Sequence, residues 1–128
     1  MYTELTQGIE VVVTPEFLPE HSRPDVPYYF FAYHVRITNR GEKPVQLISR
    51  HWIIRDGMGR NDEVRGPGVV GLQPILEIGQ SFEYSSSCPL PTPTGSMRGA
   101  YQMVDAEGAR FEAKIPLFFL RDMNRNAS

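Results

Sequence analysis

Residues 45–71, VQLISRHWIIRDGMGRNDEVRGPGVVG, decide the fold class because they combine a long strand pattern, a tight turn and a glycine-rich loop. Residues 45–56 are apolar on both strand parities, which is typical of a central strand or of one interrupted by a β-bulge. Residues 56–59 then favour a tight turn, and residues 61–65 a short polar strand that returns. The stretch therefore predicts a β-hairpin that leads into a glycine-rich loop.

Strand patterns continue on both sides of this stretch. Residues 9–13 alternate in a way that indicates a first strand ending near Pro15, and residues 29–39 alternate more clearly, with their apolar side chains on one face. Residues 97–105 and 109–120 predict a final hairpin. In that hairpin, we expect three inward-facing residues to lie opposite three others: Gly99, Tyr101 and Met103 opposite Phe111, Ala113 and Ile115.

The connecting segments carry turn residues and prolines. Residues 39–44 predict a hairpin turn, and Gly79 a turn before a strand that contains Phe82 and Tyr84. Prolines at alternate positions in residues 88–95 favour a polyproline II crossing between two sheets. No segment has an apolar repeat at helical spacing, so helix is not expected beyond a single turn.

About seven short strands separated by turns predict an all-β fold, an immunoglobulin or fibronectin type III-like β-sandwich. We expect one domain over residues 1–128, with an ordered core at about 5–120 and a disordered tail at 122–128. The spacing Gly99, Tyr101, Met103 is that of an immunoglobulin strand F, which makes Tyr101 a candidate tyrosine corner.

Composition excludes several classes of protein. The chain has 128 residues, a formal net charge of −2 and a single cysteine, Cys88, so we expect no intrachain disulfide, no cysteine zinc site and no nucleic-acid binding. No apolar run is long enough to cross a bilayer, and the first residues lack a signal-peptide pattern, so a cytoplasmic protein without membrane association is expected. Residues 36–65 nevertheless carry seven cationic and four anionic side chains, a local charge of +3.

A candidate anion site lies in this basic third. Gly66, Gly68 and Gly71 match the G-x-G-x-x-G spacing that binds pyrophosphate in dinucleotide-binding folds, but no helix can follow them here. What the pattern still predicts is a nest of backbone amides beside Arg60 and Arg65. The alternative is that the glycines only let the loop cross between sheets.

Arg50, His51 and Trp52 form a second candidate, a surface patch, although Trp52 is also a good filler between two sheets. Four arginines follow one another at intervals of five residues: Arg50, Arg55, Arg60 and Arg65. On strands this spacing alternates between the two faces, so they are not expected to form one phosphate patch. No pattern predicts a catalytic residue or a metal ligand set: Ser49, His51 and Asp56 lack a nucleophile elbow, and the three histidines are scattered.

Several segments in this order resemble the bacterial ApaG family. They are Pro44-Val45-Gln46-Leu47, Ser49-Arg50-His51-Trp52-Ile53-Ile54, Glu63-Val64-Arg65-Gly66 through Val69-Val70-Gly71, Pro89-Leu90-Pro91-Thr92-Pro93, and Gly95-Ser96-Met97 with Gly99, Tyr101, Met103 and Val104. The resemblance covers roughly residues 5–120. It implies a fibronectin type III-like β-sandwich, no settled activity, and a loose association with magnesium and cobalt handling. Related domains in eukaryotic F-box and DNA polymerase-interacting proteins resemble partner-binding modules.

Two hypotheses of function follow. The first is a non-enzymatic interaction module without a cofactor, which presents loops or an edge strand to a protein partner. The alternative is a protein that binds phosphate, pyrophosphate or a nucleotide at the glycine-rich loop. Direct binding of magnesium or cobalt is a third possibility, for which the sequence offers few ligands.

Overall fold

The computed structural model describes residues 1–122. Nine strands and one 3-10 turn make up this part of the chain: β1 (Tyr2–Thr6), β2 (Ile9–Phe17), η1 (Pro19–His21), β3 (Tyr29–Asn39), β4 (Val45–Asp56), β5 (Asn61–Pro67), β6 (Ile75–Leu76), β7 (Ser81–Leu90), β8 (Thr94–Asp105) and β9 (Arg110–Arg121). No helix within residues 1–122 is long and apolar enough to cross a membrane.

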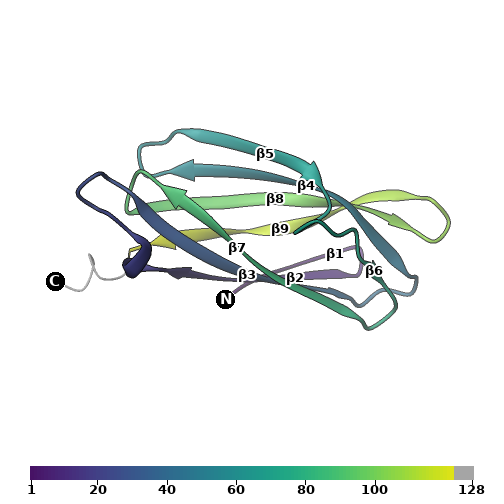
Figure 1. Cartoon of the computed structure of the whole chain (residues 1–128). Helices are drawn as coiled ribbons and strands as arrows, with labels where there is room; N and C mark the ends of the chain where they lie inside the picture. The colour runs from purple at the N-terminus through teal and green to yellow at the C-terminus, as the bar shows by residue number, and fades with distance from the viewer. Residues whose placement is uncertain (123–128) are drawn as a thin grey trace.

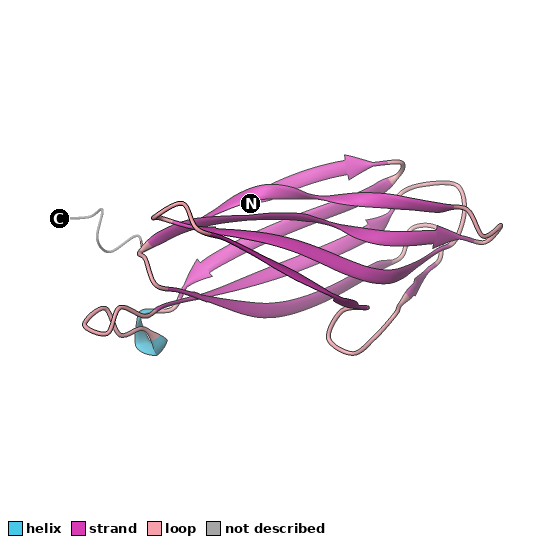
Figure 2. Cartoon of the chain, turned by 90° about the horizontal axis from the view of Figure 1, so that it is seen from above, coloured by secondary structure: helices cyan, strands magenta, loops and turns pink. Residues whose placement is uncertain are grey.

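The strands form two antiparallel sheets that stack as a sandwich (Figure 1). Sheet 1 has the order β1-β2-β3-β7, and sheet 2 has the order β5-β4-β8-β9, with the short β6 beside β4. Seen from above, the strands of both sheets run along the long axis of the molecule, with the η1 turn near one end (Figure 2). The predicted all-β sandwich is confirmed, with nine strands in the described residues instead of about seven.

The core lies between the sheets because alternating side chains of the long strands point inward. In β3, Phe31, Val35 and Ile37 are fully buried, as their alternation predicts. In β8 and β9 the register pairs Gly99 with Ile115, Tyr101 with Ala113, and Met103 with Phe111, as the sequence also predicts. The mixed parity of β4 reflects a register shift between Leu47 and Ser49, so the β-bulge, one of the two alternatives, is present.

Two strand boundaries expected at prolines are wrong. β2 continues through Pro15 to Phe17, and β7 continues through Pro89 to Leu90. Both prolines occupy edge-like positions: β1 pairs with β2 only as far as Val13, and β7 is the outer strand of sheet 1. A missing amide costs no ladder bond on such an edge, so both strands continue.

The connection at residues 39–44 is not the expected hairpin, because β3 belongs to sheet 1 and β4 to sheet 2. The Asn39 side chain is buried there and donates from Nδ2 to the carbonyls of Lys43 (2.8 Å) and Leu76 (3.0 Å), which turns the chain toward sheet 2. The crossing between β7 and β8 occurs as predicted, but only through residues 91–93. The turn at Gly79 also forms, with the Gly79 amide on the Asn39 carbonyl.

The predicted disorder of residues 122–128 falls outside the described residues except at Asp122. Asp122 is 6% exposed, and its amide donates to the Pro93 carbonyl at 2.9 Å, so the expectation is wrong for this residue.

Candidate binding pocket at the open edge

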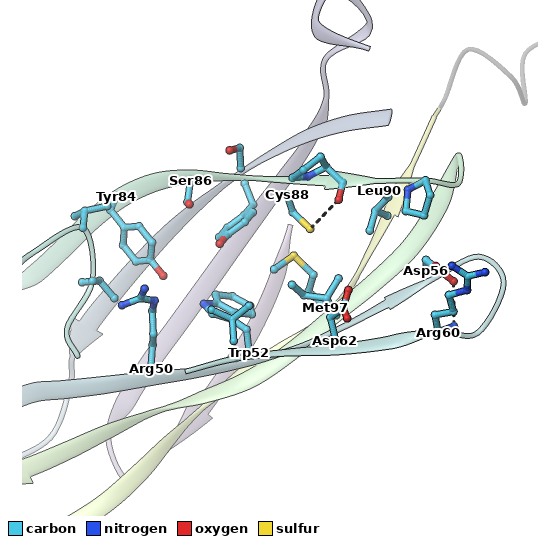
Figure 3. A pocket seen from close by; sticks show the side chains of 18 residues that line it. Arg50, Trp52, Asp56, Arg60, Asp62, Tyr84, Ser86, Cys88, Leu90 and Met97 are labelled. Carbon is cyan, nitrogen blue, oxygen red and sulfur yellow. Dashed lines mark hydrogen bonds between the residues drawn. The ribbon is translucent and has the colours of Figure 1, made fainter. Parts of the chain in front are cut away.

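A pocket of about 580 Å³ lies between β7 of sheet 1 and the β4–β5 hairpin of sheet 2. Its floor is apolar and includes Trp52, Leu90 and Met97, while its rim carries Arg50 and Asp62 (Figure 3). The volume is within the range of typical ligand pockets in proteins, about 300–1,000 Å³. This is the candidate functional site.

The pocket exists because the sequence of β5, NDEVRGP, has little to bury. Every residue of β5 is exposed or half-buried, so this strand does not fold down onto sheet 1. The ends of the opening are bridged. At one end the Gly57 amide donates to Thr92 Oγ1 at 2.7 Å, and at the other end the chain from 68 to 80 crosses from sheet 2 to sheet 1. The pocket therefore opens sideways, between two edge strands.

Trp52 forms part of the floor and is only 3% exposed. Its ring lies 5.3 Å from the Tyr33 ring and meets the Phe118 ring edge-on at 6.0 Å between centroids. The prediction that Trp52 fills the space between the sheets is confirmed. The alternative, a surface patch of Arg50, His51 and Trp52, is wrong, because Trp52 is buried and His51 points to the other face of sheet 2.

Arg50 points from β4 into the pocket, on the same face as Trp52 (Figure 3). Its Nη1 donates to the carbonyls of Pro67 (3.0 Å) and Gly68 (2.9 Å). A Cβ on Gly66 would lie 3.0 Å from Arg50 Nη2, so the glycine lets the guanidinium lie close against the backbone of β5. Arg50 has no carboxylate within ion-pair distance among residues 1–122.

Two tyrosine hydroxyls tie the sheets together beside Arg50. Tyr84 of β7 and Tyr101 of β8 share a buried hydrogen bond of 2.5 Å between their hydroxyls. Burial raises the pKa of both phenols well above the ordinary value, and the nearby Arg50 charge opposes this rise. The predicted role of Tyr101 as a tyrosine corner is wrong, because its hydroxyl bonds to a side chain of the opposite sheet instead of a nearby backbone group.

Cys88 and Asp62 face each other across the other half of the pocket. Burial raises the pKa of the Cys88 thiol to about 11, and the Asp62 charge adds to the rise. Asp62 is exposed, and within the described residues it has neither a hydrogen bond nor an ion pair from its side chain. Figure 3 shows its carboxylate directed into the pocket, with Trp52 between Asp62 and Arg50.

The structure does not bring together the residues of the predicted anion nest. Arg60 lines the pocket near Asp56, whereas Arg65 lies on the outer face of sheet 2 with Glu63 at 3.7 Å. The Gly68 amide donates to the Ile48 carbonyl and the Val69 amide to Leu72, so these two amides are already bonded. The loop therefore presents carbonyl oxygens to Arg50.

Gly68 and Gly71 have left-handed φ angles of 60° and 80°, so their backbone conformation accounts for both glycines. On the outer face of sheet 2, His51 Nε2 is buried, has no hydrogen bond from the described residues and lies 3.7 Å from Glu63 Oε1. Across residues 1–122 there is no group of three or more His, Cys, Asp or Glu side chains that could hold a metal ion.

Sequence reasoning missed the β7 side of the pocket. Ser86 and Cys88 are small residues on the inward parity of β7, so they leave space between the sheets. On the neighbouring strand β3, Phe31 and Val35 fill the corresponding space. That alternation of small side chains next to the polar β5 was the available signal. It becomes informative only when β5 and β7 are known to face each other.

Comparison with known proteins places the chain in a family. The family model of the ApaG domain matches residues 19–105. The chain is 59% identical over 120 residues to the protein ApaG of Methylobacterium nodulans, covering 94% of this chain and 92% of that protein. It is 56% identical over 104 residues to ApaG of Bdellovibrio bacteriovorus, with 81% and 82% covered. The crystal structure of the putative ApaA protein from Bordetella pertussis superposes with a TM-score of 0.87 at 57% identity, covering 88% and 92% of the two chains.

Proposed function

The chain belongs to the ApaG family, and we propose that it is a non-catalytic interaction module whose open edge binds an extended segment of a protein partner. The observation that carries the proposal is the 580 Å³ pocket that opens sideways between two edge strands, β5 and β7. A segment that lies across this opening inserts side chains into the pocket while its backbone runs beside a strand.

The two strands at the opening support strand addition. Within residues 1–122, β5 pairs only with β4 and β7 only with β3, so each has one side without a strand partner in the sheet. Alternate residues of an edge strand turn their amide and carbonyl groups outward, and peptides that add to a sheet bind these groups. The pocket below then selects side chains, since inward positions of an added strand recur every second residue.

The chemistry of the pocket supports a non-catalytic role. Its potential nucleophile, Cys88, has a pKa of about 11, and the Tyr84 hydroxyl has a raised pKa as well, so both stay protonated near neutral pH. A free, buried thiol also suits a reducing compartment such as the cytoplasm. No cofactor enters the proposed function.

A display library of random extended peptides, selected on the whole protein, tests the proposal. We expect selected peptides, once synthesised, to shift amide resonances of β5 and β7 and to change the fluorescence of Trp52, the only tryptophan. Ser86→Phe fills the pocket from β7, and Ser85→Phe adds the same bulk on the outer face of sheet 1.

Binding should fall at least about tenfold in Ser86→Phe and be retained in Ser85→Phe. Peptides that bind both variants equally, or that shift only resonances elsewhere, would reject the open edge as the binding site. ATP, pyrophosphate and magnesium belong in the same titrations. If pyrophosphate or ATP shifts Gly66 and Gly68 and no peptide perturbs β5, the phosphate-binding alternative replaces the proposal.

A further inference from the structure

We infer that the open edge recognises a partner segment in which an acidic side chain pairs with Arg50, an apolar side chain packs beside Val64, and a basic side chain pairs with Asp62. The inference rests on the proposed function and specifies the chemistry of the partner. It assigns to Arg50 the role of a specificity-determining residue.

Arg50 has the properties of an incomplete ion pair. The guanidinium is half-buried, its Nη1 is used by two loop carbonyls, and its Nε and Nη2 have no hydrogen-bond partner among residues 1–122. A cation removed from water without a counter-charge is unfavourable, and a guanidinium is suited to two parallel hydrogen bonds with a carboxylate. A carboxylate supplied by a partner completes this pair.

The surroundings hold the guanidinium ready for such a ligand. The carbonyls of Pro67 and Gly68 fix its position, and the absence of a side chain at Gly66 leaves its Nη2 close to the β5 backbone, where an added strand runs. Because the loop has already oriented Arg50, little side-chain entropy is lost when the carboxylate binds.

The register of the β4–β5 hairpin sets the spacing of the three contacts. Arg50 is opposite Gly66, Trp52 is opposite Val64, and Ile54 is opposite Asp62, so the three β5 positions share the pocket-facing parity. Asp62 lies four residues from Gly66, about 13 Å along an extended strand. An added strand therefore brings the first, third and fifth residues of a segment to Arg50, Val64 and Asp62.

The direction of the segment follows from the sheet. All pairings in sheet 2 are antiparallel, and an antiparallel segment beside β5 begins opposite Gly66 and ends opposite Asp62. The resulting order from the amino terminus is acidic, any, apolar, any, basic. A side-chain carboxylate is required, not a chain terminus, because in this direction the amino-terminal part of the segment lies at Arg50.

A synthetic heptapeptide with capped ends, TETVTKT, tests the inference on the whole protein. We expect it to shift the Val64 and Gly66 amides, to change Trp52 fluorescence, and to bind about tenfold more tightly than the version with glutamine in place of glutamate. The reversed peptide, TKTVTET, should lose a similar factor. Arg50→Gln should weaken binding of the original peptide about tenfold and abolish the preference for glutamate over glutamine. Asp62→Asn should abolish the preference for lysine over glutamine at the sixth position of the peptide.

Arg98→Gln, which removes an arginine from β8 outside the pocket lining, is the matched control and should leave binding unchanged. Arg50→Lys keeps the charge but not the two-pronged geometry and should weaken binding about threefold, which provides a second variant if Arg50→Gln does not fold. If the glutamine peptide binds the wild type at β5 as tightly as TETVTKT, the carboxylate assignment is wrong and the proposed function stands. If peptides selected for tight binding leave β5 and β7 unperturbed, both are wrong.

Discussion

The two long edges of the sandwich differ, although strands of both sheets meet at each of them. On the closed edge, β1 and β2 of sheet 1 pack against β9 of sheet 2, the Tyr2 and Phe118 rings lie 6.0 Å apart, and the Lys114 amide donates to Thr6 Oγ1 at 3.3 Å. On the open edge, the corresponding space between β5 and β7 is a pocket.

The cause of the difference lies in which strand carries large apolar side chains. β9 supplies Ile115, Phe118 and Leu120, all at most 3% exposed, whereas the only apolar side chain of comparable size on β5 is Val64, which is 41% exposed. The closed edge therefore contributes mainly to stability. On the open edge, the half-buried Arg50 has no counter-charge among residues 1–122, which is unfavourable and which a bound carboxylate would offset.

Truncation of one side chain at each edge should give the largest contrast. Phe118→Ala removes a fully buried ring that contacts Tyr2, Tyr33 and Trp52, so we expect a loss of about 3–5 kcal/mol in the free energy of unfolding. Val64→Ala should cost about 0.5 kcal/mol, because little area is buried there. Urea unfolding followed by circular dichroism measures both. Equal losses would show that β5 packs in solution more closely than this structure has it.

A methyl group added to glycine should separate the interior of sheet 2 from its open edge. In Gly99→Ala the new Cβ would overlap the backbone carbonyl of His51 between β8 and β4, so we expect a cost of about 3 kcal/mol. In Gly66→Ala the obstacle is the end of the Arg50 side chain at 3.0 Å, which needs to shift only slightly, so stability should fall by less than about 1 kcal/mol. Thermal unfolding compares the two, and a larger loss in Gly66→Ala would contradict the assignment of Arg50 to a ligand contact.

Alkaline pH should weaken the tie between Tyr84 and Tyr101 at the inner end of the pocket. Burial raises the pKa of both phenols above the unfolded value of about 10. Their stabilising contribution is therefore complete below pH 10 and is lost as the pH rises above it, by about 1.4 kcal/mol per pH unit for each phenol. Urea midpoints between pH 9 and 11.5 measure the slope. Tyr84→Phe should reduce that slope, and an unchanged slope would contradict the raised pKa of Tyr84.

The sequence was most informative where the alternation of a strand is uninterrupted. In β3, and where Gly99 to Met103 of β8 pair with Ile115 to Phe111 of β9, inward residues alternate with outward ones, and burying the inward face favours one register. The mixed parity of β4 left a central strand and a β-bulge as alternatives, and the structure places a register shift between Leu47 and Ser49. The alternation pattern did not reveal β1, because β1 is the edge strand of sheet 1 and none of its residues is fully buried.

The site was less predictable because its residues are adjacent only after folding. Arg50, Gly66 and Gly68 were identified as candidates, but as parts of two different sites. The loop could present its amides to an anion or its carbonyls to Arg50. Which of the two it does depends on the path of the backbone, which the glycine spacing does not determine. Tyr84 and Cys88 face Arg50 and Asp62 only because the chain passes from β3 of sheet 1 to β4 of sheet 2 after Asn39, while β7 pairs with β3 and so lies opposite β4.

Reactivity of Cys88 provides the finest test of the open edge, because it should change without any change in stability. With a pKa of about 11, this thiol carries roughly 200-fold less thiolate at pH 8 than a free cysteine, whose pKa is about 8.5. Alkylation by iodoacetamide should therefore be slow and should accelerate about tenfold per pH unit between pH 8 and 10.

Thr3→Cys in a Cys88→Ser background places an exposed thiol near the closed edge and should react at the free rate. Addition of TETVTKT should slow Cys88 further, because Cys88 lines the pocket, and should leave the thiol at position 3 unaffected. If both thiols react equally fast, or if the peptide protects both, the open and closed edges do not differ in the way proposed.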